Sequence, residues 1–73
     1  MATKLANMVK IVGPQRAERL LKQQIREDVK SLDNARKIQL SAVYSLMAIA
    51  AEEAGKRKVA LILASVANWI LAQ

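Results

Sequence analysis

The chain has 73 residues, of which 53% are hydrophobic, and it carries twelve Lys and Arg residues against six Asp and Glu residues. This length limits it to one small domain, and the hydrophobic share is too high for a disordered chain. The sequence contains no Cys and no His, which excludes disulfides and the common zinc and haem ligand sets, so we expect no metal and no cofactor. The core of so short a chain has marginal stability by itself. With disulfides and metals excluded, self-association is the remaining way to stabilise it.

The excess of positive charge is concentrated in the first half of the chain. Residues 1–37 hold nine basic and four acidic side chains, a net charge of +5, whereas residues 38–73 hold three and two, a net charge of +1. This asymmetry predicts a negatively charged partner, either nucleic acid or an anionic membrane surface. Residues 1–10 lack the apolar core of a secretory signal, and the lack of Cys fits a reducing compartment. We therefore expect a cytoplasmic location, or one within a virion.

The first two predicted helices meet at Gly13 and Pro14. Apolar residues at helical spacing predict a first helix over about 3–12, and they are Leu5, Met8, Val9 and Val12. Gly13 suits the end of that helix, and Pro14 suits the first turn of a second helix over about 14–31. The second helix carries one apolar stripe, formed by Ala17, Leu21, Ile25, Val29 and Leu32.

Two apolar helices are predicted in the second half of the chain. Ser31 or Asp33 could cap the third helix, over about 34–54, which is apolar almost all round and is therefore expected at the centre of the fold. The fourth, over about 58–72, has one apolar face made of Val59, Ile62, Leu63, Val66, Trp69 and Ile70. Its opposite face is also poor in charge, so we expect an oligomer interface on this helix, at Leu61, Val66, Trp69 and Ile70.

The junction at residues 52–58 leaves two arrangements open. Gly55 can end the third helix and start a hairpin, whereas the spacing of Glu52 from Lys56 and of Glu53 from Arg57 suits one continuous helix of about 58 Å. The two most apolar runs, 38–51 and 59–72, are shorter than the roughly 20 residues that a membrane span needs; buried helices are favoured, with a two-pass membrane hairpin as the alternative. We predict an all-α bundle of about four helices in a single domain over residues 1–73, with a basic part (1–32) and an apolar, oligomerising part (33–73).

The second predicted helix has a basic face. Five cations fall within about 120° of its circumference, span about 21 Å, and have no acidic residue among them: Arg16, Arg19, Lys22, Arg26 and Lys30. Lys56, Arg57 and Lys58 form a second basic patch. Both sets have an ordinary alternative interpretation as solvated surface, but their charge also suits phosphate groups.

The turn before this basic face resembles the helix-hairpin-helix family of non-specific DNA-binding elements. The matching residues lie within about 3–25 and are Leu5, Val9, Val12, Gly13, Pro14, Ala17, Leu20 and Leu21. The resemblance implies that backbone N–H groups of Val12 and Gly13 receive a DNA phosphate, with Lys10 and Arg16 beside them. The family has a Gly where this chain has Ile11, and a plain corner between two helices is the other interpretation of Gly13 and Pro14.

The residue types present favour binding over catalysis. Without His there is no Ser–His pair and no imidazole for acid–base chemistry, so we do not expect an enzyme. One Trp, one Tyr and no Phe are too few for stacking on single-stranded bases, which leaves contacts to phosphates with little sequence preference. We predict an oligomeric protein that binds duplex nucleic acid. The alternatives are a self-assembling viral or filament coat subunit, a membrane-surface protein, and a small regulator that binds another protein.

Overall fold

The computed structural model describes residues 2–73, with side chains described from residue 4. Four helices and no strands form in this part of the chain: α1 (Ala2–Val12), α2 (Pro14–Lys30), α3 (Asn34–Glu53) and α4 (Arg57–Leu71). The all-α prediction is confirmed, and the ends of each predicted helix fall within two residues of the observed ends. Because α3 ends before Gly55 and α4 starts after it, the alternative of one continuous helix is wrong.

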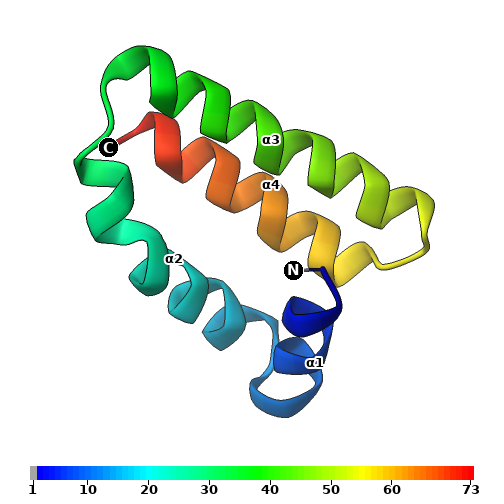
Figure 1. Cartoon of the computed structure of the whole chain (residues 1–73). Coiled ribbons are helices and arrows are strands. Elements are labelled where there is room, and N and C mark those ends of the chain that lie inside the picture. Colours follow the sequence, from blue (N-terminus) through cyan, green and yellow to red (C-terminus); the bar gives the residue numbers. More distant parts are fainter. Residues whose placement is uncertain (1) are drawn as a thin grey trace.

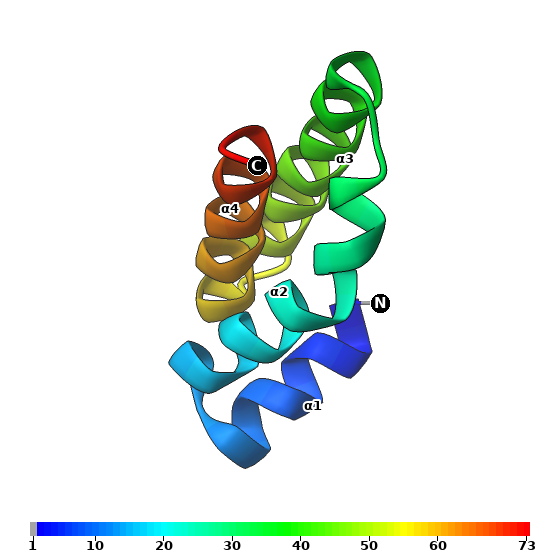
Figure 2. The same cartoon turned by 90° about the vertical axis from the view of Figure 1, so that its left-hand side faces the viewer.

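The helices are arranged around α4. Helices α3 and α4 form an antiparallel hairpin, and α1 and α2 pack together against the α4 side of it (Figure 1). The same arrangement is visible in the perpendicular view, where α3 lies away from α1 (Figure 2). The sequence predicted α3 as the central helix, and this prediction is wrong, since α4 is the element that packs against all three others.

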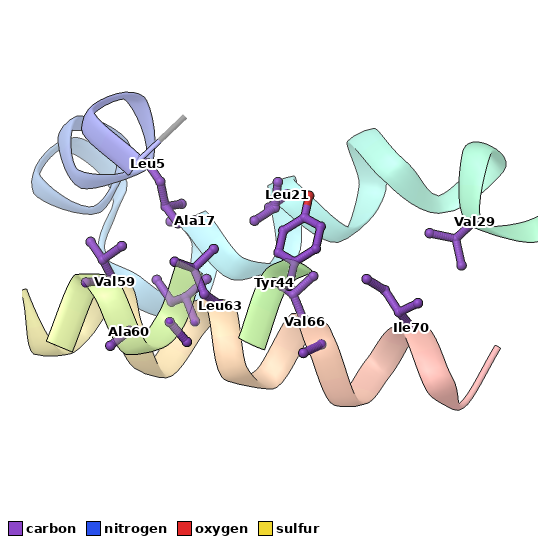
Figure 3. Close-up of a cluster of buried hydrophobic side chains, with 14 residues drawn as sticks. Leu5, Ala17, Leu21, Val29, Tyr44, Val59, Ala60, Leu63, Val66 and Ile70 are labelled. Carbon is purple, nitrogen blue, oxygen red and sulfur yellow. The ribbon is translucent and has the colours of Figure 1, made fainter. Parts of the chain in front are cut away.

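One hydrophobic core joins the four helices. Side chains from α1 and α2, among them Leu5, Ala17 and Leu21, point toward Val59 and Leu63 of α4 (Figure 3). Helix α4 buries seven of its 15 residues, which are Val59, Ala60, Ile62, Leu63, Val66, Ala67 and Ile70. Helix α3 buries only four of its 20 residues, which are Ser41, Tyr44, Ala48 and Ala51. Alanines on both sides of the hairpin allow the two helix backbones to approach closely.

Each inter-helix turn is set by residues that the sequence singled out. Gly13 has φ 88° and ψ 161°, and Pro14 is the first residue of α2. Asp33 caps α3, because its side chain accepts a hydrogen bond of 2.8 Å from the Arg36 N–H. At the end of α3, the N–H groups of Gly55 and Lys56 donate to the carbonyls of Glu52 and Ala51. This pair of bonds is a Schellman motif, which Gly55 permits through its φ of 78°.

Part of the predicted oligomer interface is wrong. Val66 and Ile70 have no exposed surface, because they belong to the chain's own core. Trp69 is half-buried, and its ring centroid lies 6.0 Å from the Lys22 ammonium. Leu61 is 62% exposed and stays available to a partner. A helical wheel identifies an apolar face but cannot tell whether the same chain or another one covers it, which is why the prediction mixed the two faces of α4.

The outer face of α3 remains uncovered by the chain itself. Ile38, Val43, Leu46 and Ile49 are each at least half exposed. The sequence left a membrane hairpin open, and within residues 2–73 no helix combines the length and the apolar character needed to cross a bilayer.

Candidate nucleic-acid interface

An open groove of about 910 Å³ lies where the α1–α2 turn meets the α3–α4 turn. It contains the two positive-φ glycines, Gly13 and Gly55. Its lining residues are Ala6, Asn7, Val9, Lys10, Gly13, Pro14, Gly55, Lys56, Arg57, Lys58 and Val59. Four of these residues are cations and none is acidic. The fold thus brings the basic patch at 56–58 together with Lys10, which lies 46 positions earlier in the chain.

The cations of the groove are solvent-exposed and have no ion-pair partner among the described residues. Lys10, Lys56, Arg57 and Lys58 are all exposed, whereas both ion pairs in residues 4–73 are formed by α2 side chains. The floor of the groove is apolar, since Val59 is buried and Ala6 and Val9 pack against the core. The groove therefore presents positive charge without an internal carboxylate to neutralise it.

The first turn of α4 adds further positive potential. Lys56 is the residue before α4, and among the described residues no side chain accepts a capping hydrogen bond from the start of this helix. The Ala60 N–H donates to the Lys56 carbonyl, so the N–H groups of residues 57–59 precede the first bond of the helix and lack intrahelical acceptors. A helix start carries about half a positive charge. Three cations beside it form an arrangement that an anion would stabilise.

Helix α2 also starts at the groove, but its backbone differs from the predicted contact. The Gly13 N–H donates to the Val9 carbonyl at 2.9 Å, and Val12 is the last residue of α1. The resemblance implied that the Gly13 N–H binds a phosphate. This is wrong, because that N–H already donates to the Val9 carbonyl. The N–H groups of Gln15 and Arg16 are the ones without intrahelical acceptors, since the Ala17 N–H is the first to donate back, to the Gly13 carbonyl.

The basic face of α2 is mostly exposed, as the sequence predicted. Arg16, Arg19, Arg26 and Lys30 are exposed, and the Lys30 ammonium lies 4.0 Å from a Glu27 carboxylate oxygen. Lys22 is the exception, because it is half-buried, bonds Glu18 at 3.0 Å and lies over the Trp69 ring. Lys22 therefore serves the packing of α2 against α4, and its charge is compensated within the chain.

Two shallow hollows connect the groove to this helix face. One, of about 290 Å³, runs from Val12 past Gly13 and Pro14 to Arg16 and Arg19. The next, of about 320 Å³, is lined by Arg16, Arg19, Leu20 and Gln23. Gly13 and Pro14 line both the first hollow and the groove, so the two basic regions form one surface. We call this the basic surface: Lys10, Arg16, Arg19, Lys56, Arg57 and Lys58.

The sequence identified these cations but not their proximity. The basic patch at 56–58 follows Gly55 at the start of α4, and no periodicity relates the start of one helix to a turn more than 40 residues away. Only the packing of α1 against α4 places the two turns together. Arg26 and Lys30 lie farther along α2, outside the groove and both hollows.

Comparison with protein-family models, with curated proteins and with solved structures found no match to this chain.

Proposed function

We propose that this protein is a non-enzymatic binder of duplex nucleic acid, which it contacts through phosphates at the basic surface. The observation that carries the proposal is the groove in which two distant basic segments meet without an acidic residue. Cations arranged in this way repel one another and the α4 helix start, and a phosphate backbone relieves that repulsion. Counterion release from the nucleic acid supplies the main driving force.

The connected set of cations on the basic surface suits a polymer better than a single small anion. The molecule measures 33 × 23 × 17 Å, so its longest dimension is comparable to one turn of duplex DNA, about 34–36 Å. The groove and the two hollows offer six cations in a connected set. No aromatic side chain lines the groove or the two hollows, and Trp69 is half-buried with the Lys22 ammonium over its ring. The basic surface therefore offers no platform on which bases could stack. Binding with little base preference follows from such phosphate contacts.

The main test is the salt dependence of binding to a labelled duplex of about 20 base pairs, measured by fluorescence anisotropy. If four to five phosphates are neutralised, the logarithm of the binding constant falls with the logarithm of salt concentration with a slope of about −4. A slope near zero would contradict the proposal. A single-stranded oligonucleotide of the same length binding more tightly than the duplex would contradict the preference for duplex.

Lys56→Asp provides a variant whose loss of binding cannot come from unfolding. Asp at this position can cap α4 and removes a cation from its positive end, so we expect the free energy of unfolding to rise by about 0.5–2 kcal/mol. The same change should weaken duplex binding about tenfold and flatten the salt slope by about 1 unit. Thermal unfolding and anisotropy measure the two effects on one sample.

Lys37→Asp is the matched control, because it changes the net charge equally at the opposite end of the hairpin. There the Lys37 ammonium donates to the Gln73 carbonyl at 3.0 Å, far along α4 from the groove. We expect this variant to bind the duplex with nearly the wild-type salt slope. Equal losses in both variants would show a general charge effect and would remove the basic surface from the proposal.

A further inference from the structure

Helix α3 carries its charges in the order opposite to the one that its own dipole favours. Arg36 and Lys37 lie in or next to its first turn, and Glu52 and Glu53 lie in its last turn. Cations are unfavourable near a helix N-terminus and anions near its C-terminus. Asp33 caps the first turn, but the side chains of Arg36, Glu52 and Glu53 are exposed and form no ion pair among the described residues, so they remain available to charges on a partner.

Between these charged ends, the exposed face of α3 is uncharged and mostly apolar, with Gln39 as an exposed polar residue. Residues 38–51 contain no charged side chain, and the large exposed side chains are Ile38, Val43, Leu46 and Ile49. At 100° per residue, these four residues fall within about 140° of the circumference, opposite the buried Tyr44 and Ala48. The molecule exposes 5032 Å², against about 4,450 Å² expected for a folded monomer of 8.0 kDa.

We propose that a second copy of this chain packs on this face, with the two α3 helices antiparallel about a two-fold axis level with Tyr44 and Ser45. In this register Val43 lies opposite Leu46 of the second copy, and Arg36 lies opposite Glu53 of the second copy. The symmetry repeats both contacts. The basic end of each helix meets the acidic end of the other, so the charges that oppose the dipole of one helix are compensated by its neighbour.

Charge selects this arrangement over a parallel one. Parallel packing in register would bring Arg36 against Arg36 and Glu53 against Glu53 of the second copy, and like charges across an interface are unfavourable. The 20-residue α3 is about 30 Å long. Leu61, which is exposed beside Ile49 in a hollow between α3 and α4, extends the apolar surface toward the roughly 800 Å² per partner of a standard interface.

A charge-swap experiment tests the register. Arg36→Glu and Glu53→Arg, each alone, place like charges at two symmetric contacts, and we expect each to weaken the dimer at least tenfold in sedimentation equilibrium. The double variant R36E/E53R restores opposite charges at both contacts and should recover the wild-type dissociation constant. Both single changes complement the α3 dipole, so dissociation cannot be attributed to unfolding of the helix.

The apolar centre is tested by Leu46→Lys, with Ile11→Lys as the matched control. Leu46 is 66% exposed in the chain and Ile11, on α1, is 81% exposed, so neither change disturbs the core. We expect Leu46→Lys to give monomers with an unchanged helical circular dichroism spectrum, while Ile11→Lys stays dimeric.

Three outcomes would overturn the proposal. They are a wild-type protein that sediments as a monomer, a double variant R36E/E53R that remains as weakly associated as its single variants, and long polymers in negative-stain images in place of closed pairs.

Discussion

Helix α3 buries two side chains that carry a polar group, Ser41 and Tyr44. Burial has a different consequence for each of them. The Ser41 hydroxyl donates to the Ala67 carbonyl at 2.8 Å, so its polar group is satisfied across the hairpin and links α3 to α4. Tyr44 extends from α3 toward α2 and is 4% exposed (Figure 3). Burial disfavours the charged phenolate and raises the pKa of Tyr44 above its ordinary value of 10.0.

This pKa shift predicts a loss of stability in alkaline solution. Because the folded pKa lies above the unfolded one, the contribution of Tyr44 is complete below about pH 10 and is lost as the pH rises toward and through the folded pKa. Tyr44→Phe should therefore match the wild type in urea unfolding at about pH 7 and exceed it at about pH 11. Identical profiles at both pH values would contradict the burial of the phenol.

Two of the three inter-helix turns depend on glycine, although the backbone requirement differs between them. Gly55 follows α3 in a Schellman motif, a left-handed position that Asn also tolerates. Gly13 combines φ 88° with ψ 161°, a region that is essentially restricted to glycine. A Cβ built at either position meets no atom within 4 Å, so substitutions there report backbone strain without steric clashes.

Substitution by Asn should distinguish the two turns. We expect Gly55→Ala to lower the free energy of unfolding by about 1–2 kcal/mol and Gly55→Asn to lower it less. Gly13→Ala and Gly13→Asn should be equally destabilising, by about 1–3 kcal/mol. Thermal and urea unfolding of the four variants measure these differences. A mild Gly13→Asn would show that the turn at Gly13 relaxes to an ordinary left-handed geometry.

The stability of the whole molecule depends on α4, because the core is assembled on that helix. Leu63 has no exposed surface and lies among side chains from α1 and α2, whereas Leu71, on the same helix, is 55% exposed. The other three helices all pack against α4, so a cavity there weakens several helix contacts together.

A matched pair of leucine truncations tests this view of the core. Leu63→Ala should cost about 2.7–5 kcal/mol of unfolding free energy, which is a large share of the stability of a chain this small. Leu71→Ala should change it by less than about 0.5 kcal/mol. Urea unfolding at one protein concentration compares the two. Similar costs would mean that α4 is not the centre of the core.

The sequence by itself determined the helical segments and the charged residues, because these depend on local physics: the helical spacing of apolar residues and the backbone freedom of Gly13. It left open whether the last two helices are continuous and whether Ser31 or Asp33 caps the third, and the structure decided both. It did not determine which apolar helix lies at the centre, since α3 and α4 are similarly apolar and only their packing against α1 and α2 distinguishes them. Tertiary structure alone decided that Val66 and Ile70 are internal, that the face of α3 is exposed, and that Lys10 meets the patch at 56–58. These are relations between residues far apart in the chain, and they follow from which surfaces pack together.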